Sequence, residues 1–333
     1  MFGELDGADP VTTDWAGPRP RLAISACLLG HEVRFDGGHK RDRSLLGSLG
    51  PYVDWVPLCP EVEAGMGTPR PSIRQVRVEG ELRVIAPRTE RDWTAELRQA
   101  TETRMTALAS IPLDGIVVKK DSPSCGMERV KVYSPRGGAP SRDGVGVFTA
   151  AFRETYPHLP AEEEGRLRDP LLREHFVDRV FSRARFRQEL TDDPTPAGLL
   201  RFHTRHKLIV LAHSPEHYRL LGPIAARAES DPWEDVLANY GAVLSTALNV
   251  KATPGRHVNV LQHLAGHVKN ELDGADKTEL LESMERYRTG QLPLVVPMTL
   301  LAHHLRRNPR AEWAQAQVYL EPYPRSLMLR NVI

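Results

Sequence analysis

The chain has 333 residues, a net charge of +1, 41% hydrophobic residues and 26% charged residues. These values are ordinary for a globular protein, and the length suffices for about two domains of ~100–200 residues each. No stretch approaches the ~20 consecutive apolar residues that a membrane-spanning helix needs. Composition therefore excludes a transmembrane protein, while the balanced charge favours no particular class of partner.

The first 19 residues are acidic and rich in proline and glycine. They have neither the positive segment nor the apolar segment of a secretory signal. We expect residues 1–19 to form a flexible tail and the protein to be cytoplasmic, with no membrane as a partner.

Residues 20–165 carry short apolar runs that alternate with a helical pattern, which predicts an α/β domain with a mostly parallel sheet. Between the second and third runs, residues 76–85 predict a hairpin about Glu79–Gly80, and residues 92–111 repeat apolar side chains at helical spacing. Buried strands are predicted at RLAISA (21–26), YVDWVPL (52–58) and DGIVVK (114–119).

The second half of the chain is helical in pattern. Residues 157–170 mix prolines with an acidic run, a composition that is typical of a linker or domain boundary. Residues 166–196 contain a predicted connecting helix at 171–190, and residues 197–333 predict an all-α domain whose helices are separated by Pro and Gly. We interpret this all-α domain as a tRNA- or substrate-binding domain.

Three cysteines occur, Cys27, Cys59 and Cys125. An odd number in a cytoplasmic chain argues against a disulfide framework, and three separately buried thiols are the simplest alternative. However, each cysteine follows a predicted strand, at the point where a turn begins. Ligands of open parallel sheets bind beyond the carboxyl ends of the strands, so we expect the three thiols to share one site.

Thiolate ligands favour zinc, copper(I) or an iron–sulfur cluster. The closely spaced cysteine pairs that are usual for structural zinc are missing. A site of three cysteines and one histidine is a further possibility, with His31 and His39 nearest in the sequence. A four-iron cluster normally takes four cysteines, so three would leave one iron open to a substrate atom.

Other chemically capable side chains occupy the same predicted loops. A carboxylate beside a metal-bound substrate is a natural general base, for which Glu61 and its neighbour Glu63 are candidates. A turn or capping role is the simpler explanation for Glu61, and a solvated strand end is the simpler explanation for Lys119 and Lys120. The remaining candidates for substrate binding are Asp36, Arg70, Lys119, Lys120 and Ser122, with Ser124 beside Cys125.

The motifs SACLLGHEVRFDGG, VPLCPEVEAGMGTPRP and KKDSPSCG resemble those of the thiouracil desulfidase family. The second half, with FHTRHKLIVLAHSPEHYRLLG and PLVVPMTLLAHH, is similar to the helical domain of the fused tRNA 4-thiouridine desulfidases (RudS-type). The resemblance runs from about residue 20 to the C-terminus.

This resemblance implies a [4Fe-4S] cluster held by Cys27, Cys59 and Cys125, with one iron free to bind a thiocarbonyl sulfur. Water would then attack the pyrimidine carbon, which releases sulfide without net redox chemistry. The resemblance assigns Glu61 as the base that activates water and Ser124 as an oriented hydrogen-bond partner, with Glu63 and Ser122 as rivals.

The implied partner is thiolated tRNA. A small nucleobase needs no helical domain of this size, and the connecting helix and the domain contain clustered cations that can contact phosphate. The cations are Arg179, Arg183 and Arg187, then Arg201, Arg205 and Lys207, then Arg306, Arg307 and Arg310. Charged helix faces are usually only solvated, so Arg183, Arg187, Arg205 and Lys207 are retained as candidate RNA contacts.

Other interpretations concern the histidines, nucleotide binding and the identity of the substrate. The histidine pairs His203/His206 and His263/His267 lie at helical spacing and suit packing better than metal binding. No glycine-rich phosphate loop is present, so no nucleoside triphosphate is expected. The enzyme could instead act on free thiouracil or 4-thiouridine monophosphate, or the chain could be a non-catalytic zinc- and RNA-binding protein.

Overall fold

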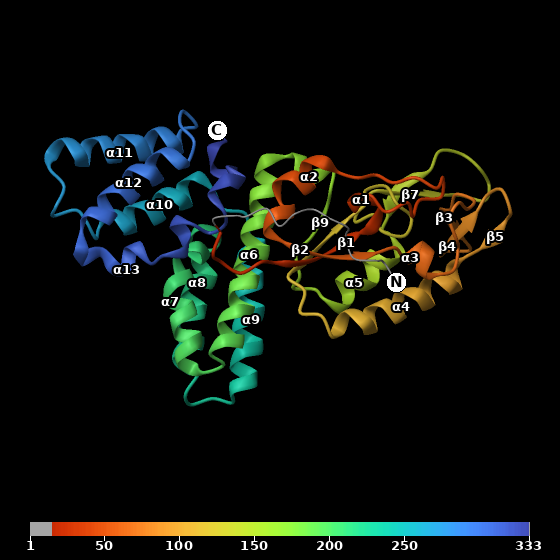
Figure 1. Cartoon of the computed structure of the whole chain (residues 1–333), viewed down its shortest axis with the longest axis horizontal. Coiled ribbons are helices and arrows are strands. Elements are labelled where there is room, and N and C mark those ends of the chain that lie inside the picture. The colour runs from red at the N-terminus through yellow and green to blue at the C-terminus, as the bar shows by residue number, and fades with distance from the viewer. Residues whose placement is uncertain (1–14, 333) are drawn as a thin grey trace. The chain divides into compact units, whose positions relative to one another are not determined.

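The computed structural model describes residues 15–332, and the first 14 residues of the predicted tail lie outside this range. The chain divides into two compact units, with the first ending at Asp169 and the second beginning at Pro170 (Figure 1). Each unit is described by itself. Among the described residues, no helix is both long and apolar enough to cross a membrane.

The first unit contains the predicted parallel sheet. Its strands are β1 (Arg21–Ser25), β2 (Asp54–Leu58), β6 (Gly115–Val118) and β9 (Ala161–Glu163), in the order β2-β1-β6-β9. All neighbours in this sheet are parallel. The three strands predicted from apolar runs are therefore adjacent, and the predicted α/β class is confirmed.

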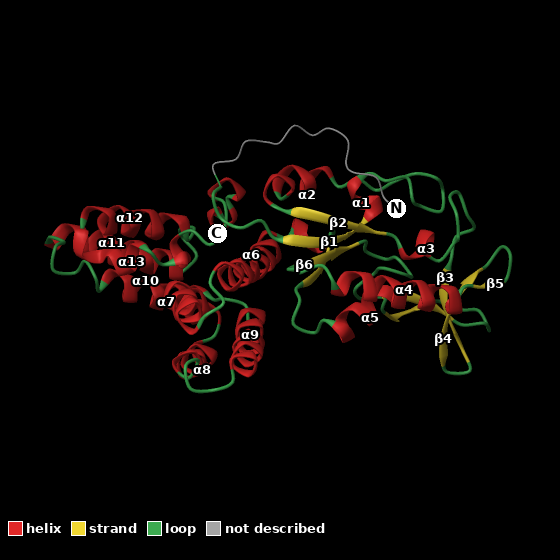
Figure 2. Ribbon diagram, turned by 60° about the horizontal axis from the view of Figure 1, so that its bottom comes forward, coloured by secondary structure: helices red, strands yellow, loops and turns green. Residues whose placement is uncertain are grey.

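Helices cover both faces of this sheet. Ala23 of β1 lies opposite Ile116 of β6, and both belong to a buried cluster with Leu108 of α4 (Thr94–Ala109) and Phe148 of α5 (Val147–Thr155). Successive side chains of a strand point to opposite faces, so the alternate residues of these strands pack on the other face of the sheet. Figure 2 shows α1 (Ala26–Leu29) and α2 (Arg43–Ser48) on that side.

A second, five-stranded sheet has the order β5-β4-β3-β7-β8. The predicted hairpin is confirmed as β3 (Arg74–Val78) and β4 (Glu81–Ala86), which pair antiparallel. Glu79 and Gly80 both have positive φ, as a tight two-residue hairpin turn requires. The other strands, which the sequence patterns did not indicate, are β5 (Arg91–Asp92), β7 (Val130–Tyr133) and β8 (Ser141–Gly144).

The acidic run near residue 163 is not a linker. Glu162 and Glu163 belong to β9 at the edge of the parallel sheet, and together with Glu164 they are buried. Each carboxylate has specific donors: Glu162 bonds Arg166, Glu163 accepts from the Met127 amide, and Glu164 pairs with Lys119. The first unit ends at Asp169, within the predicted boundary at 157–170, but the composition did not reveal the contacts that bury these glutamates.

The second unit is entirely helical and has a single large buried core. Helix α6, predicted as a connecting helix, packs inside this unit through Phe186, whose ring contacts Phe202 and Tyr240. Several helices begin at hydroxyl side chains, such as Thr195 and Ser214, that accept from the first turn. The helices are α6 (Pro170–Asp192), α7 (Pro196–His213), α8 (Pro215–Ala226), α9 (Trp233–Asn249), α10 (Pro254–Ala265), α11 (Gly274–Arg288), α12 (Val295–Arg307) and α13 (Glu312–Gln315).

Short helices complete both units. In the first unit, α3 (Pro60–Glu63) follows β2 and carries two of the candidate carboxylates. The remaining short elements are 3₁₀ helices: η1 (Gly50–Tyr52), η2 (Arg166–Arg168), η3 (Pro309–Ala311), η4 (Val318–Leu320), η5 (Arg325–Leu327) and η6 (Leu329–Asn331).

Candidate functional site

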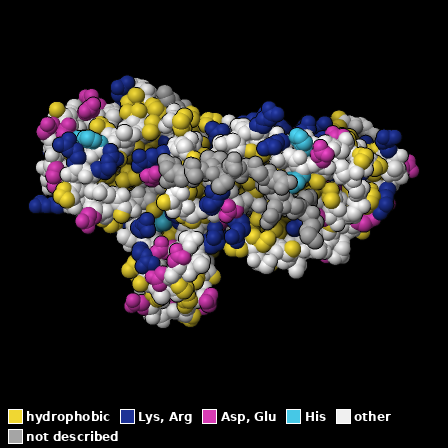
Figure 3. Space-filling model, viewed as in Figure 1, with side chains coloured by type: hydrophobic (Ala, Val, Ile, Leu, Met, Phe, Trp, Pro, Cys, Tyr) yellow, Lys and Arg dark blue, Asp and Glu magenta, His cyan; other side chains and the backbone are white. Residues whose placement is uncertain are grey.

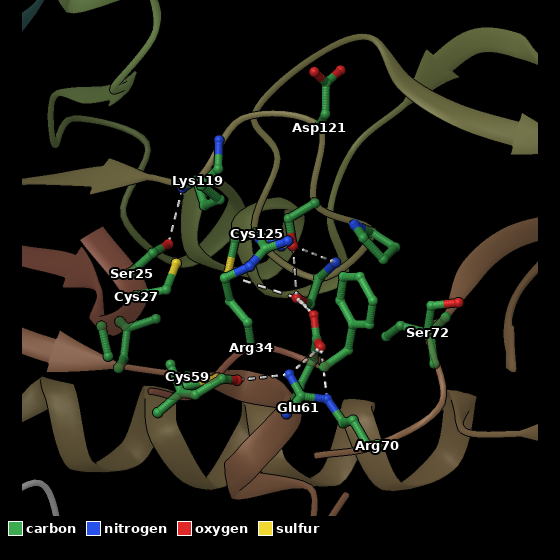
Figure 4. Close-up of a pocket in the computed structure, with 18 of the residues that line it drawn as sticks. Ser25, Cys27, Arg34, Cys59, Glu61, Arg70, Ser72, Lys119, Asp121 and Cys125 are labelled. Atoms are coloured by element: carbon green, nitrogen blue, oxygen red, sulfur yellow. Dashed lines mark hydrogen bonds and ion pairs between the residues drawn. The ribbon is translucent and has the colours of Figure 1, made fainter. Parts of the chain in front are cut away.

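A cavity of about 390 Å³ lies beyond the carboxyl ends of β1, β2 and β6. Cys27, Cys59 and Cys125 all line it, and each comes from the segment that follows one of these strands. Parallel neighbours deliver their carboxyl ends to one edge of a sheet, which explains the convergence. Figure 4 shows the three cysteines on one side of the cavity, with Glu61 and Arg70 across from them.

Local backbone interactions fix the first two cysteines. Cys27 lies in the one-turn helix α1, and its carbonyl accepts from the Lys40 amide at 2.9 Å. Cys59 is the residue before α3; its carbonyl accepts from the Glu63 amide, and its own amide donates to Glu63 Oε1, both at 3.0 Å. The Glu63 carboxylate therefore caps the Cys59 amide at the start of α3, so this side chain is used by the backbone of Cys59.

The Cys125 loop is held by the start of α5 and by the second sheet. Gly146 approaches the backbone of Ser124 and Cys125 so closely that an added Cβ would lie 2.6 Å from the Cys125 amide nitrogen. The fully buried Gln75 of β3 donates to the carbonyls of Pro123 and Val145 at 2.9 and 2.7 Å. The second sheet therefore positions a loop of the parallel sheet.

All three thiols are free and buried. Burial is the main cause that raises the pKa of Cys27 to about 11 and of Cys59 to about 12, and it raises the pKa of Cys125 as well. Reactive nucleophilic cysteines require the opposite, a lowered pKa in an electropositive setting. A bound metal deprotonates its thiol ligands outright, so the three thiols suit metal ligands better than nucleophiles.

The three cysteines line one cavity, but their side chains do not meet at a single point that could hold one metal ion. Among residues 15–332, no group of three or more His, Cys, Asp or Glu side chains could hold a metal ion. Neither His31 nor His39 lines the cavity. Three thiols around one cavity fit a multi-iron cluster, in which each cysteine binds a different iron.

Glu61 lies at the centre of a buried hydrogen-bond network. Its Oε1 accepts from Ser124 Oγ at 2.7 Å, and its Oε2 accepts from Arg70 Nη2 at 2.5 Å and Nε at 3.1 Å. The side chain of Arg70 is only 3% exposed, and it also donates to the carbonyls of Val33 and Gly67. Arg70 thus fixes Oε2 of the Glu61 carboxylate, while Oε1 accepts from Ser124.

The two rival residues have different contacts. Besides capping Cys59, Glu63 pairs with Arg104, with Nε 2.8 Å from Oε2, and it does not line the cavity. Ser122 Oγ lies 3.0 Å from Ser124 Oγ and accepts from the Cys125 amide at 3.2 Å. Ser124 is the serine that contacts Glu61 directly, and it is 1% exposed.

Two candidate lysines line the cavity, but Asp36 does not. Lys119 pairs with Glu164, while the more exposed Lys120 lies 3.9 Å from Asp121. The carboxylate of Asp36 turns back to accept from the Gly38 amide at 3.2 Å and to pair with the lining residue Arg34 at 3.4 Å. Its short side chain closes its own turn.

The lining residues that were not singled out from the sequence include Ser25, Arg34, Phe35, Ser72 and Asp121. Ser25 lies at the end of β1 and accepts from the Lys119 amide at 2.9 Å, which ties the first strand end to the third. Its position directly before Ala26–Cys27 is a signal that sequence reasoning could have used. Arg34 and Phe35 adjoin Asp36, which was chosen in their place.

The candidate RNA contacts all lie in the helical unit, in different settings. Arg205 is exposed, and Arg187 is partly buried. Arg183 Nη1 donates to Ser245 Oγ at 2.9 Å, and Lys207 Nζ lies 4.7 Å from the centroid of Trp313. On the face shown in Figure 3, Lys and Arg side chains are interspersed with Asp and Glu and do not form one continuous basic area.

The histidine pairs have packing partners. His206 stacks on Phe202 and contacts the Phe202 carbonyl at 2.9 Å, while His203 Nδ1 contacts Tyr240 Oη at 3.1 Å. The His267 ring lies 4.8 Å from Trp313. These contacts support the packing interpretation.

Comparisons with known proteins agree with this site. Residues 22–164 match the family model of 2-thiouracil desulfurase, and residues 207–324 match that of a protein family of unknown function, DUF1722. The [4Fe-4S]-dependent thiouracil desulfidase TudS is 31% identical, covering 45% of this chain and 95% of TudS, with a TM-score of 0.37. The uncharacterized protein YbgA of Escherichia coli K12 is 34% identical over 140 residues, which are 41% of this chain and 81% of YbgA.

The chain therefore belongs to the 2-thiouracil desulfurase family through its first unit, and its second unit carries a DUF1722 domain. The residues of the cavity lie within the matched range of the desulfurase model. The expected family is confirmed, as is the fusion to a separate helical domain.

Proposed function

We propose that this protein is a [4Fe-4S]-dependent desulfidase that converts 4-thiouridine in tRNA to uridine and sulfide by non-redox hydrolysis. The observation that carries the proposal is the convergence of three buried thiols and the Glu61–Ser124 pair on one cavity, within a desulfurase domain. The overall reaction exchanges a C=S bond for a C=O bond with one water, so no oxidant or reductant is needed.

Cys27, Cys59 and Cys125 would hold the cluster. A cluster with one iron free of cysteine supplies a Lewis acid for the thiocarbonyl sulfur. No fourth thiolate is available, since the chain has three cysteines. The surrounding burial keeps bulk water away from the ligands, which is consistent with a cofactor site.

Glu61 is the proposed general base. Arg70 occupies one of its oxygens, so the other is directed at Ser124 and the cavity. Glu61 takes a proton from water as the water oxygen attacks the pyrimidine carbon. Ser124, donating to Glu61 in this structure, orients the carboxylate and the water that it activates.

The helical unit is proposed to hold the RNA. The resemblance to RudS-type enzymes supports this role, as do the exposed cation Arg205 of α7 and the partly buried Arg187 of α6. Phosphate contacts of this kind provide affinity that weakens as salt rises. The same catalytic cavity suits a smaller substrate, so free thiouracil or 4-thiouridine monophosphate is the alternative.

The test compares thiolated tRNA with 4-thiouridine monophosphate as substrates for anaerobically purified, iron-loaded protein. The proposal predicts a higher kcat/KM for tRNA. In the double variant Arg187→Glu/Arg205→Glu, kcat/KM for tRNA should fall. The slope of log(kcat/KM) against log[salt] should become shallower by about one for each lost phosphate contact. Activity on the mononucleotide should not change.

Arg227→Glu is the matched control, because Arg227 is an exposed arginine of the same unit that pairs with Asp231. It should leave both activities in place. Equal or better turnover of the mononucleotide by the wild type would favour the small-substrate alternative. A colourless protein that binds tRNA without converting it would instead support the non-catalytic alternative.

A further inference from the structure

The turn of residues 34–38 presents two side chains to the cavity that the proposed chemistry does not use. Arg34 and Phe35 line the cavity next to the three cysteines. The turn is closed by the Gly37 amide on the Arg34 carbonyl at 3.0 Å and by the Arg34 amide on the Gly38 carbonyl at 3.2 Å. Gly37 has φ +77°, a conformation that glycine adopts without strain.

Phe35 is unusual in its exposure. It is 41% exposed, although burying a side chain of this size is normally favourable. Among the described residues that line the cavity, Phe35 is the one aromatic side chain. Its neighbours there are mostly small, polar or charged, so no other aromatic ring of the lining stacks on it.

The ring is anchored to the catalytic network. The Phe35 carbonyl accepts from the Arg70 amide at 2.9 Å, and the Arg70 guanidinium holds Glu61. The guanidinium carbon of Arg34 lies 5.3 Å from the centroid of Phe35 and supports the ring, while Asp36 pairs with Arg34. The aromatic ring is therefore placed in a defined position relative to the proposed base.

We propose that Phe35 is a substrate-binding residue whose ring stacks on the planar face of the thiolated pyrimidine. The inference rests on the proposed function, because it takes a thiolated pyrimidine as the substrate. An aromatic side chain at the edge of a nucleotide site provides a sequence-tolerant stacking surface. Asp36, on the same turn, acts as a positioning residue through Arg34.

The stacking has a consequence for the substrate. A base that stacks on Phe35 must expose one of its faces, so in a folded RNA it has to leave its neighbours in the stack. The cavity would then select a pyrimidine that is already unpaired or free. This makes the same residue useful for a mononucleotide and for a nucleotide within tRNA.

The experiment uses the full-length, iron-loaded protein with Phe35→Ala, Phe35→Leu and Phe35→Tyr. The probes are 4-thiouridine monophosphate in turnover and uridine monophosphate, the product, in calorimetric binding. Phe35→Ala should raise both KM and the product Kd about tenfold, with a smaller change in kcat. Phe35→Leu should not restore binding, whereas Phe35→Tyr, which keeps the π face, should restore most of it.

Iron content and the visible spectrum should match those of the wild type in all three variants. Leu220→Ala removes a similarly exposed apolar side chain from the helical unit and should leave Kd unchanged. An unchanged Kd in Phe35→Ala, or full rescue by leucine, would overturn the stacking role while the wild type stays active. A wild type that neither binds uridine monophosphate nor converts any thiolated pyrimidine would overturn the proposed function itself.

Discussion

At the residue scale, Glu61 and Glu63 show how two similar side chains, two positions apart, acquire different tasks. Glu63 pairs with Arg104 and accepts from the Cys59 amide, and its own side chain lies outside the cavity lining. Glu61 faces the cavity and is shared between Arg70 and Ser124. The sequence alone could not separate them, because the separation depends on a capping interaction and on the distant residues Arg70 and Ser124.

Glu61→Gln should keep the cluster and lose the rate. The amide retains the size of the side chain but cannot take a proton from water, so kcat should fall by about 10²–10⁴-fold. The measurement is turnover of thiolated substrate at matched iron content. Glu63→Gln is the control and should lower thermal stability while kcat stays within a few-fold; equal losses of rate in both variants would remove Glu61 from the role of base.

At the element scale, sequence patterns succeeded where an element carries its own hydrophobic signal. The strands β1, β2 and β6 are continuous apolar runs, and the β3–β4 hairpin has its turn residues in place. Prediction failed for β9, whose glutamates are buried only because Arg166, Lys119 and the Met127 amide reach them. Sequence patterns also did not indicate that the Asp36 carboxylate turns back on its own loop.

Helix α10 of the second unit carries a buried histidine that makes stability depend on pH. His257 is 8% exposed, and Nδ1 contacts Tyr319 Oη at 2.8 Å. Burial, followed by the nearby charge of Arg330, lowers the pKa of His257 from 6.5 to about 3. Below pH 6.5 the unfolded chain therefore binds a proton that the folded chain does not, and stability falls as pH falls.

From pH 7 to pH 5, this histidine alone should cost about 2 kcal/mol of unfolding free energy. His257→Gln, which can still hydrogen-bond Tyr319 but does not titrate, should remove that part of the decrease in urea unfolding of the helical unit. His263→Gln, on an exposed position of the same helix, should leave the decrease in place. The same pH slope in wild type and His257→Gln would contradict the assignment.

At the scale of the whole molecule, the two units have separate cores. The second, helical unit has a large buried cluster. The first unit, which contains the cavity and is called the cavity unit below, has buried clusters around Phe148 and Val84. The proposed cofactor ligands belong to the first unit alone, and the candidate RNA contacts to the second. Chemistry and RNA binding are thus assigned to parts of the chain that fold around different cores.

Anaerobic calorimetry should therefore show two unfolding transitions, of which one depends on iron. A ligand bound only to the folded state stabilises that state, so chelation of iron should lower the midpoint of the cavity unit by more than about 5 °C. The transition of the helical unit should not move. Cys125→Ala should show the lowered midpoint before any chelator is added, whereas equal shifts of both transitions would contradict separate stabilisation.

The three cysteines lie in segments that are far apart in the sequence, and no two of them share an element. A chain whose parallel sheet has not formed cannot bring them together, because each thiol is delivered by a different strand. Metal loading at this site is consequently a late event in folding, unlike loading at a local cysteine pair. The iron bound per chain in a preparation should thus count the molecules in which β1, β2 and β6 have correctly assembled.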